Sequence, residues 1–143
     1  MERGIFITFE GIDGCGKTTQ VLETAIYLYN KNKYNSIIIT REPYKDQEIR
    51  KILSEDNNPY TKADKFAEMF IEDRKNHINE IINPSINKRI HVICDRYSMS
   101  TLAYQWAQGV PLEKLIEMHR EITVPDITFL IDVPVEIAIQ RMK

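Results

Sequence analysis

Four short runs rich in apolar residues occur along this chain, each followed by a charged residue or a proline. Runs of this length that are rich in β-branched side chains are typical of buried strands. We therefore predict four strands, at residues 5–9, 36–40, 91–95 and 127–133.

Between these runs, apolar residues recur at the spacing of amphipathic helices. The spacing predicts helices at residues 17–32, 47–53, 63–82, 98–108 and 112–122, and a further one that begins at residue 135 and reaches residue 141. The long helix at 63–82 is expected to stop at Asn83-Pro84, because the residue before a proline avoids helical geometry. Residues 54–61 have the composition of a loop.

Strands that are buried on both faces and alternate with helices indicate an α/β domain with a doubly wound parallel sheet. The chain has 143 residues and contains no repeat, linker or low-complexity segment. We expect a single domain over residues 1–143, large enough to bury a core.

Composition excludes several classes of protein. The net charge of −2 argues against a protein that coats nucleic acid, and no apolar stretch is long enough for a membrane span. The N-terminus lacks the apolar core of a signal peptide, so a cytoplasmic location is expected. Cys15 and Cys94 are too few for a disulfide framework and do not have zinc-ligand spacing.

The first strand leads into "GIDGCGKTT", residues 11–19, which matches the phosphate-loop pattern G-x-x-x-x-G-K-[ST]. In such a loop the backbone N–H groups and the start of the next helix bind phosphate oxygens. Lys17 would contact the β- and γ-phosphates, and the Thr18 hydroxyl would bind Mg²⁺. The glycines do not have the spacing of a dinucleotide site, so we expect a nucleoside triphosphate. The residues expected to bind this triphosphate are Gly11, Gly14, Cys15, Gly16, Lys17, Thr18 and Thr19.

Charged residues follow the second and third strands, in "TREP" and "CDRYS". The carboxyl ends of parallel strands lie at one edge of the sheet, so Arg41, Asp95 and Arg96 should converge on the phosphate loop. Asp95 is a candidate for the Mg²⁺ shell, directly or through water. The two arginines can bind a second phosphate, that of the acceptor, unless they are solvated caps at the strand ends.

On the long predicted helix, Phe66, Phe70, Arg74 and His77 share one stripe. Phe70 could stack on a base while Arg74 contacts its carbonyl edge. In the alternative, the phenylalanines belong to the core and Arg74 is solvated. His77 is interpreted as a packing or surface residue.

The set "FEGIDGCGKTTQ", "TREP", "MFIEDR", "DRYSMSTLAYQ" and "PDITFLIDV" resembles the thymidylate kinase family, of the P-loop nucleoside monophosphate kinases, over nearly the whole chain. The resemblance implies a P-loop NTPase-type sheet of strand order 2-3-1-4-5, with the fifth strand absent here. It also implies transfer of the γ-phosphoryl group from ATP to dTMP in the presence of Mg²⁺, and a homodimer.

The resemblance also assigns roles within the acceptor site. Lys17, Asp95 and Arg96 would take part in catalysis, and Arg41 and Arg96 would hold the dTMP phosphate. Phe70 would stack on thymine and Arg74 would bond its carbonyl oxygen. By the same resemblance, Thr101 would contact the edge of the base, and Tyr104 would fill the space next to the 2′ position of the sugar and so favour deoxyribose. Asp13 would point at the 3′-hydroxyl, and Gln105 is the last residue of the "DRYSMSTLAYQ" motif.

Two departures from the family pattern bear on these expectations. "TREP" continues as Tyr-Lys-Asp rather than Gly-Gly-Thr, so we expect a differently shaped turn. The chain also ends before the family's arginine-bearing lid, fifth strand and last helix, so we expect either a fragment of a longer kinase or a short form with impaired chemistry. Some relatives carry, at the position of Gly14, an arginine that stabilises the transition state. Because Gly14 has no side chain, we expect this arginine to come from the lid.

Two other functions fit the same motifs. A P-loop kinase for a deoxynucleoside would use the same phosphate loop, although a nucleoside offers Arg41 and Arg96 no phosphate. A lidless nucleotide-binding module with impaired catalysis would bind ATP or dTMP and form no dTDP.

Overall fold

The computed structural model describes residues 2–55 and 62–143. Its sheet has the strand order β2-β3-β1-β4, and every neighbouring pair is parallel. The strands are β1 (Phe6–Glu10), β2 (Ile37–Arg41), β3 (His91–Asp95) and β4 (Ile127–Leu130). The four predicted strands, their parallel arrangement and the 2-3-1-4 part of the expected order are confirmed.

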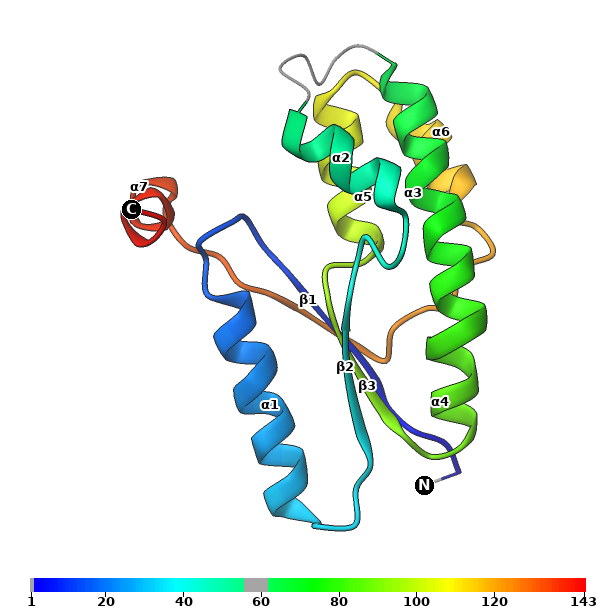
Figure 1. The fold of residues 1–143 in the computed structure, drawn as a ribbon, viewed down its shortest axis with the longest axis vertical. Coiled ribbons are helices and arrows are strands. Elements are labelled where there is room, and N and C mark those ends of the chain that lie inside the picture. The colour runs from blue at the N-terminus through cyan, green and yellow to red at the C-terminus, as the bar shows by residue number, and fades with distance from the viewer. Residues whose placement is uncertain (1, 56–61) are drawn as a thin grey trace.

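Helices cover both faces of this sheet, as expected for a doubly wound domain. Figure 1 shows α1 (Lys17–Lys31) on one face, and α3 (Ala63–His77) and α4 (Asn83–Asn87) on the other. β1 is buried along its whole length because it lies between β3 and β4 and beneath helices. Its side chains alternate between two cores: Phe6 packs with Ile82 and Val92, whereas Ile7 and Phe9 pack with Val21.

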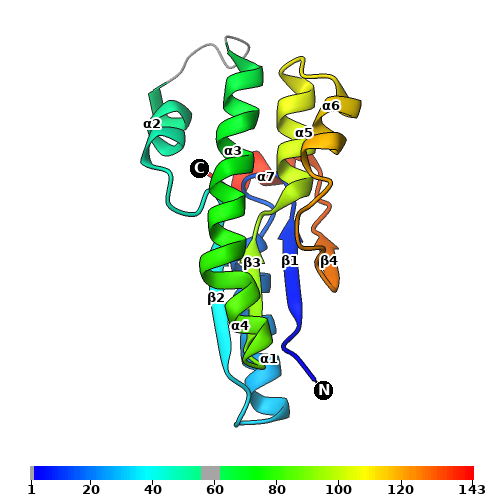
Figure 2. The same cartoon turned by 90° about the vertical axis from the view of Figure 1, so that its right-hand side faces the viewer.

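The carboxyl ends of the strands lie beneath a group of helices. These are α2 (Gln47–Glu55), the start of α3, α5 (Ser98–Ala107) and α6 (Leu112–Met118), which Figure 2 shows above the sheet. The last helix, α7 (Val135–Arg141), lies close to the loop between β1 and α1. No helix in the described part of the chain is both long and apolar enough to span a bilayer.

The prediction that the long helix stops at Asn83-Pro84 was wrong. After α3 the helical path continues through a π-helical turn, η1 (Ile78–Ile82), and then through α4, which begins at Asn83. The Asn83 N–H bonds the Ile78 carbonyl, five residues back, so the turn is wider than an α-helical one. A wider turn relieves the clash between the proline ring and the preceding turn, and lets the helix pass Pro84.

Three other element ends differ from the predictions by more than one residue. α2 reaches Glu55, so the first two residues of the predicted loop are helical, and the rest of it, 56–61, lies outside the described residues. α6 ends at Met118 rather than at residue 122, because the chain then tightens into turns such as Arg120 N–H to Glu117 O, 3.1 Å. β4 ends at Leu130, although the Ile131 N–H still bonds the Glu10 carbonyl at 2.8 Å.

Candidate active site

The phosphate loop joins β1 to α1 and turns sharply at its glycines. Gly14 and Gly16 have φ angles of 79° and 101°, in the region where a side chain is strained. The Lys17 ammonium folds back over the loop and donates to the carbonyls of Gly11 at 3.0 Å and Ile12 at 3.2 Å. The loop therefore holds its lysine close to the backbone N–H groups that would meet a phosphate.

Helix α7 packs directly on this loop. A Cβ atom added at Gly14 would lie 2.5 Å from the carbonyl oxygen of Ala138, closer than real Cβ contacts. Arg141 donates from Nη1 to the Cys15 carbonyl at 3.1 Å. Gly14 is therefore required for the approach of α7, and that approach brings Arg141 to the edge of the loop.

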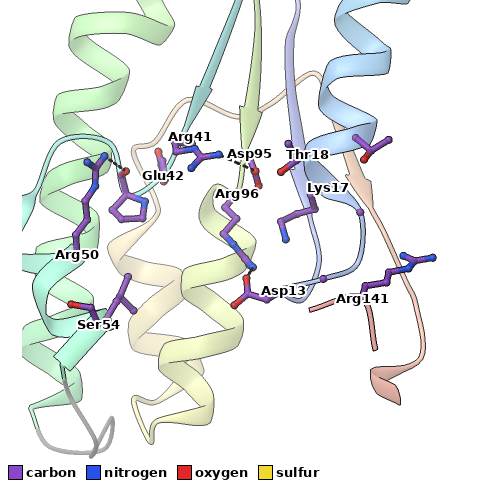
Figure 3. Close-up of a pocket in the computed structure, with 15 residues that line it drawn as sticks. Asp13, Lys17, Thr18, Arg41, Glu42, Arg50, Ser54, Asp95, Arg96 and Arg141 are labelled. Atoms are coloured by element: carbon purple, nitrogen blue, oxygen red, sulfur yellow. Dashed lines mark hydrogen bonds and ion pairs between the residues drawn. The ribbon is translucent and has the colours of Figure 1, made fainter. Parts of the chain in front are cut away.

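A cavity of about 870 Å³ opens at the carboxyl ends of β1, β2 and β3, and Figure 3 shows its lining. Gly14, Gly16 and Lys17 line its loop side, together with Thr18 and Thr19 from the first turn of α1. The predicted charged residues Asp13, Arg41, Asp95 and Arg96 line it as well. Arg50 of α2, which was not predicted from the sequence, reaches the same cavity and donates to the Tyr44 carbonyl at 2.9 Å. Its place on a surface helix, away from any strand end, offered no signal.

Asp95 is held at the end of β3 beneath this cavity. Its Oδ2 lies 4.0 Å from Arg41 Nη2, while its buried Oδ1 has no hydrogen-bond partner among the described residues. A buried carboxylate oxygen that is left free needs a ligand or a water, since an unpaired polar atom is unfavourable there. Together with the Thr18 hydroxyl on the same cavity wall, it forms a set of oxygen donors that suits Mg²⁺.

Arg96 is held in a left-handed conformation, with φ of 71°. Its backbone N–H bonds Phe9 O at 2.8 Å, and its guanidinium pairs with Asp13 at 2.6 Å and contacts Ser100 Oγ at 3.2 Å. Left-handed backbone is unfavourable for such a residue and is seen most often at functional sites. The Asp13 carboxylate thus points toward Arg96 and away from the loop, as Figure 3 shows.

A second, narrower cavity of about 240 Å³ continues from the first and shares five lining residues with it, Asp13 and Arg96 among them. Four further predicted acceptor residues line it: Phe70, Thr101, Tyr104 and Gln105. The Gln105 side chain is buried, and its Oε1 has no hydrogen-bond partner in the described part of the chain. The second cavity is therefore partly aromatic and offers an unused acceptor.

Arg74 lies behind this second cavity rather than on its surface, with only 1% of its area exposed. Its guanidinium pairs with Glu42 at 2.7 Å and donates to Thr101 Oγ1 at 2.9 Å and His119 Nε2 at 2.8 Å. The alternative interpretation, a solvated Arg74, is therefore excluded, because α3 turns this side chain inward against the buried Glu42 carboxylate.

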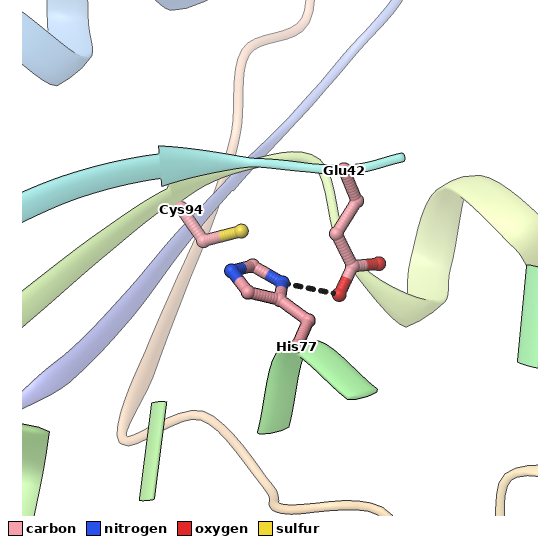
Figure 4. Close-up of side chains that lie close together, drawn as sticks. All are labelled: Glu42, His77 and Cys94. Carbon is pink, nitrogen blue, oxygen red and sulfur yellow. Dashed lines mark hydrogen bonds and ion pairs between the residues drawn. The ribbon is translucent and has the colours of Figure 1, made fainter. Parts of the chain in front are cut away.

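His77 is also buried, and it bonds Glu42 at 3.0 Å and Thr40 Oγ1 at 2.8 Å. Its interpretation as a packing residue is confirmed. Figure 4 shows His77 and Glu42 beside Cys94, a grouping that has the donor types of a metal site. However, Glu42 already pairs with Arg74, and burial raises the pKa of the Cys94 thiol well above its ordinary value. This cluster therefore has a structural role around the Glu42–Arg74 ion pair, at the wall of the cavity.

The turn after "TREP" is held by α3. The Asp73 carboxylate accepts the backbone N–H groups of Tyr44, Lys45 and Asp46 at 2.5, 2.9 and 2.9 Å. The Tyr44 ring also stacks on His77, with centroids 4.5 Å apart. A carboxylate on a neighbouring helix thus fixes the turn that carries Arg41 and Glu42 into the cavity.

Glu10 is another buried acid near the site that was not predicted from the sequence. Its carboxylate accepts the Tyr97 N–H at 2.8 Å and the Ser100 hydroxyl at 2.5 Å. Burial raises the pKa of this carboxyl, and the hydrogen bonds partly oppose that change. Glu10 therefore joins the end of β1 to the start of α5 and sets the position of the segment that carries Arg96.

Comparisons with known proteins agree on one family. The family model described as thymidylate kinase matches residues 9–143. A probable thymidylate kinase of Pyrococcus horikoshii is 40% identical, over 99% of this chain and 71% of that protein. The thymidylate kinase of Desulfotalea psychrophila is also 40% identical, over 93% of this chain and 65% of that protein. The crystal structure of thymidylate kinase from Ehrlichia chaffeensis superposes with a TM-score of 0.81 at 37% identity, and covers 96% of this chain and 81% of that one.

Proposed function

The chain belongs to the thymidylate kinase family and is a dTMP kinase, a phosphotransferase that uses ATP; from this premise we propose how its residues divide the work. The first cavity takes the ATP phosphates and the acceptor phosphate, and the second takes the nucleoside part of dTMP. The observation that carries this division is that the two cavities meet at Asp13 and Arg96.

The donor half is the phosphate loop. Lys17 releases its bonds to the loop carbonyls and contacts the β- and γ-phosphates, while the loop N–H groups bind the remaining oxygens. The contributing residues are Gly11, Gly14, Cys15, Gly16, Lys17, Thr18 and Thr19. Arg141, at the edge of the loop, adds positive charge to this half.

Thr18 and Asp95 would hold Mg²⁺, because a hydroxyl and an unpartnered buried carboxylate oxygen face the same cavity. When bound, the ion neutralises charge on the donor phosphates.

The acceptor phosphate is bound by Arg41 and Arg96, with Arg50 as a third arginine from the opposite wall. These side chains hold a dTMP phosphate oxygen in line with the γ-phosphorus. That oxygen forms the new bond to phosphorus as the bond to the β–γ bridging oxygen breaks, and ADP leaves.

The nucleoside occupies the second cavity. Phe70 stacks on thymine. The Thr101 hydroxyl accepts a hydrogen bond from Arg74 and donates one to a carbonyl of the base. The free Gln105 Oε1 can accept the ring N–H. Tyr104 occupies the space that a 2′-hydroxyl would need, and the Asp13 carboxylate accepts a hydrogen bond from the 3′-hydroxyl.

A coupled assay with ATP, Mg²⁺ and either dTMP or thymidine tests this proposal. We expect dTMP to be the efficient acceptor, because three arginines line a site that thymidine leaves without a phosphate. Efficient phosphorylation of thymidine but not of dTMP would show that the protein is a deoxynucleoside kinase. Saturable dTMP binding without formation of dTDP would show that this chain is a nucleotide-binding module without kinase activity.

We also propose a homodimer and a cytoplasmic location. Large apolar side chains on the outer surface of α5 and α6 support a partner surface: Met99, Trp106 and Ile116 are each more than half exposed. Light scattering after size exclusion distinguishes a monomer of 16.8 kDa from a dimer.

A further inference from the structure

His119 is the first residue after α6, and its half-buried ring lies between that helix and Arg74 of α3. Figure 2 shows α6 beside α5, which with α3 carries residues that line the second cavity. The ring contacts the Leu115 carbonyl through Nδ1 at 2.6 Å and Arg74 Nη1 through Nε2 at 2.8 Å. It does not line either cavity itself.

The positions of the protons in this contact are forced by chemistry. A guanidinium has five N–H donors and no acceptor, so His119 Nε2 must accept from Arg74. The Leu115 carbonyl can only accept, so Nδ1 must carry the single proton. His119 is therefore a neutral imidazole with its proton on Nδ1.

Arg74 in turn positions a residue of the cavity wall. Glu42 holds one side of the guanidinium, His119 holds Nη1, and Nη2 donates to Thr101 Oγ1 at 2.9 Å. Since Thr101 Oγ1 accepts from Arg74, its hydroxyl proton is available to donate to a carbonyl in the cavity. A shift of Arg74 would thus move the Thr101 hydroxyl, which lines the cavity.

We propose that His119 is a positioning residue of the acceptor-base cavity, which holds Arg74, and through it Thr101, only while its imidazole is neutral. This proposal rests on the proposed function, in which the second cavity holds the nucleoside of dTMP. The consequence is a site that loses acceptor affinity on acidification while the phosphate loop keeps its affinity for ATP.

Two charged groups face the His119 ring, the Arg74 guanidinium and, behind it, the Glu42 carboxylate. Protonation of Nε2 would remove the acceptor and place a second cation against Arg74. Burial lowers the pKa of His119 from the ordinary value of 6.5, and the bond to the Leu115 carbonyl partly opposes this. The ring is therefore neutral at neutral pH and gains its proton below that ordinary value.

The test compares three variants of the full chain by calorimetric titration with thymidine, which carries no titrating phosphate, and with dTMP. His119→Leu removes the acceptor, and His119→Gln keeps an acceptor oxygen but does not titrate. His91→Gln is the matched control: His91 is also buried, has a lowered pKa and accepts the Ile5 N–H at 3.0 Å, but lies at the opposite end of β3.

For His119→Leu we expect the thymidine and dTMP dissociation constants to rise about tenfold at neutral pH, the size of a lost hydrogen bond to a charged group. The ATP dissociation constant should stay unchanged. His119→Gln should restore most of the affinity, and it should bind thymidine equally well on either side of the histidine titration. The wild type and His91→Gln should both bind it more weakly on the acid side.

Equal pH profiles for the wild type and His119→Gln would overturn the proposal, and so would unchanged thymidine affinity in a folded His119→Leu. Thermal melts of each variant show whether a loss of thymidine affinity is due to unfolding. If His119→Leu is unfolded, the pH profile of His119→Gln tests the proposal by itself. If the wild type binds neither dTMP nor thymidine, the proposed function fails first, so the two failures are distinguishable.

Discussion

The two halves of the site are built in different ways. The donor half is built mainly from one continuous stretch, residues 11–19, in which backbone N–H groups and the start of α1 surround the expected phosphates. Only Asp95 and Arg141 are added to it from elsewhere in the described chain. The acceptor half takes side chains from β2, α2, α3, β3, α5 and the end of α6, and is supported by a buried network around Arg74. A local turn is thus sufficient for a triphosphate, whereas base recognition requires the tertiary fold.

The largest expected effect comes from the network under the acceptor half. Glu42→Gln leaves the buried Arg74 guanidinium without its counter-charge, and we expect a loss of about 3–5 kcal/mol in the free energy of unfolding. Urea denaturation measures it. Asp64→Asn, which breaks the exposed pair with Lys114, is the control and should leave the unfolding midpoint unchanged. Equal, small effects of both changes would show that the buried pair does not support this half.

The donor half depends instead on its glycines. Gly14→Ala adds a side chain at a φ of 79°, where its Cβ would meet the Ala138 carbonyl of α7. Gly109→Ala is the matched change, because its φ is 101° and nothing lies within 4 Å of the added Cβ. The backbone penalty common to both is about 1–2 kcal/mol. We expect Gly14→Ala to lose more than Gly109→Ala by urea denaturation and also to weaken ATP binding; equal losses would mean that α7 does not press on the loop.

The smallest expected effect is the pH dependence of stability. Burial lowers the pKa of His91 and of His119 below 6.5, so the unfolded chain takes up protons first as the pH falls. Their contribution to stability is therefore full above this value and is lost below it, by at most about 1.4 kcal/mol per pH unit for each group.

Melting temperatures measured above and below the histidine titration check this, with His91→Gln beside the wild type. Glu10 acts in the opposite direction because burial raises its pKa, but its contribution cancels in the difference between the two proteins. The variant should lose less stability on acidification, and an identical loss would contradict a neutral, buried His91.

The same contrast explains what could be predicted from the sequence. The strands and the phosphate loop could be predicted because apolar runs and glycine spacing are local signals in the sequence. The convergence of Arg41, Asp95 and Arg96 on one cavity followed from the rule that strand ends meet at one edge. Arg74 was placed on the correct face of its helix, but its burial depends on Glu42, which lies 32 residues away.

The remaining differences have the same physical origin. No local pattern marks Arg50 or His119. Arg50 reaches the cavity from a helix away from any strand end, and His119 acts through Arg74, a partner on another element. The passage of the long helix through Pro84 depends on a π-helical turn, which the proline rule does not include. Sequence patterns therefore describe what is local, and the acceptor half is largely not local.

The central claim, that the two halves bind different substrates independently, is tested most directly by calorimetric titration of two variants with ATP and with dTMP. Lys17→Met should weaken ATP binding at least tenfold and leave dTMP binding nearly unchanged, since Lys17 contacts only the phosphate loop. Arg96→Gln should do the reverse, because Arg96 lies where the two cavities meet and faces the acceptor. Similar losses of both ligands in both variants would contradict the account.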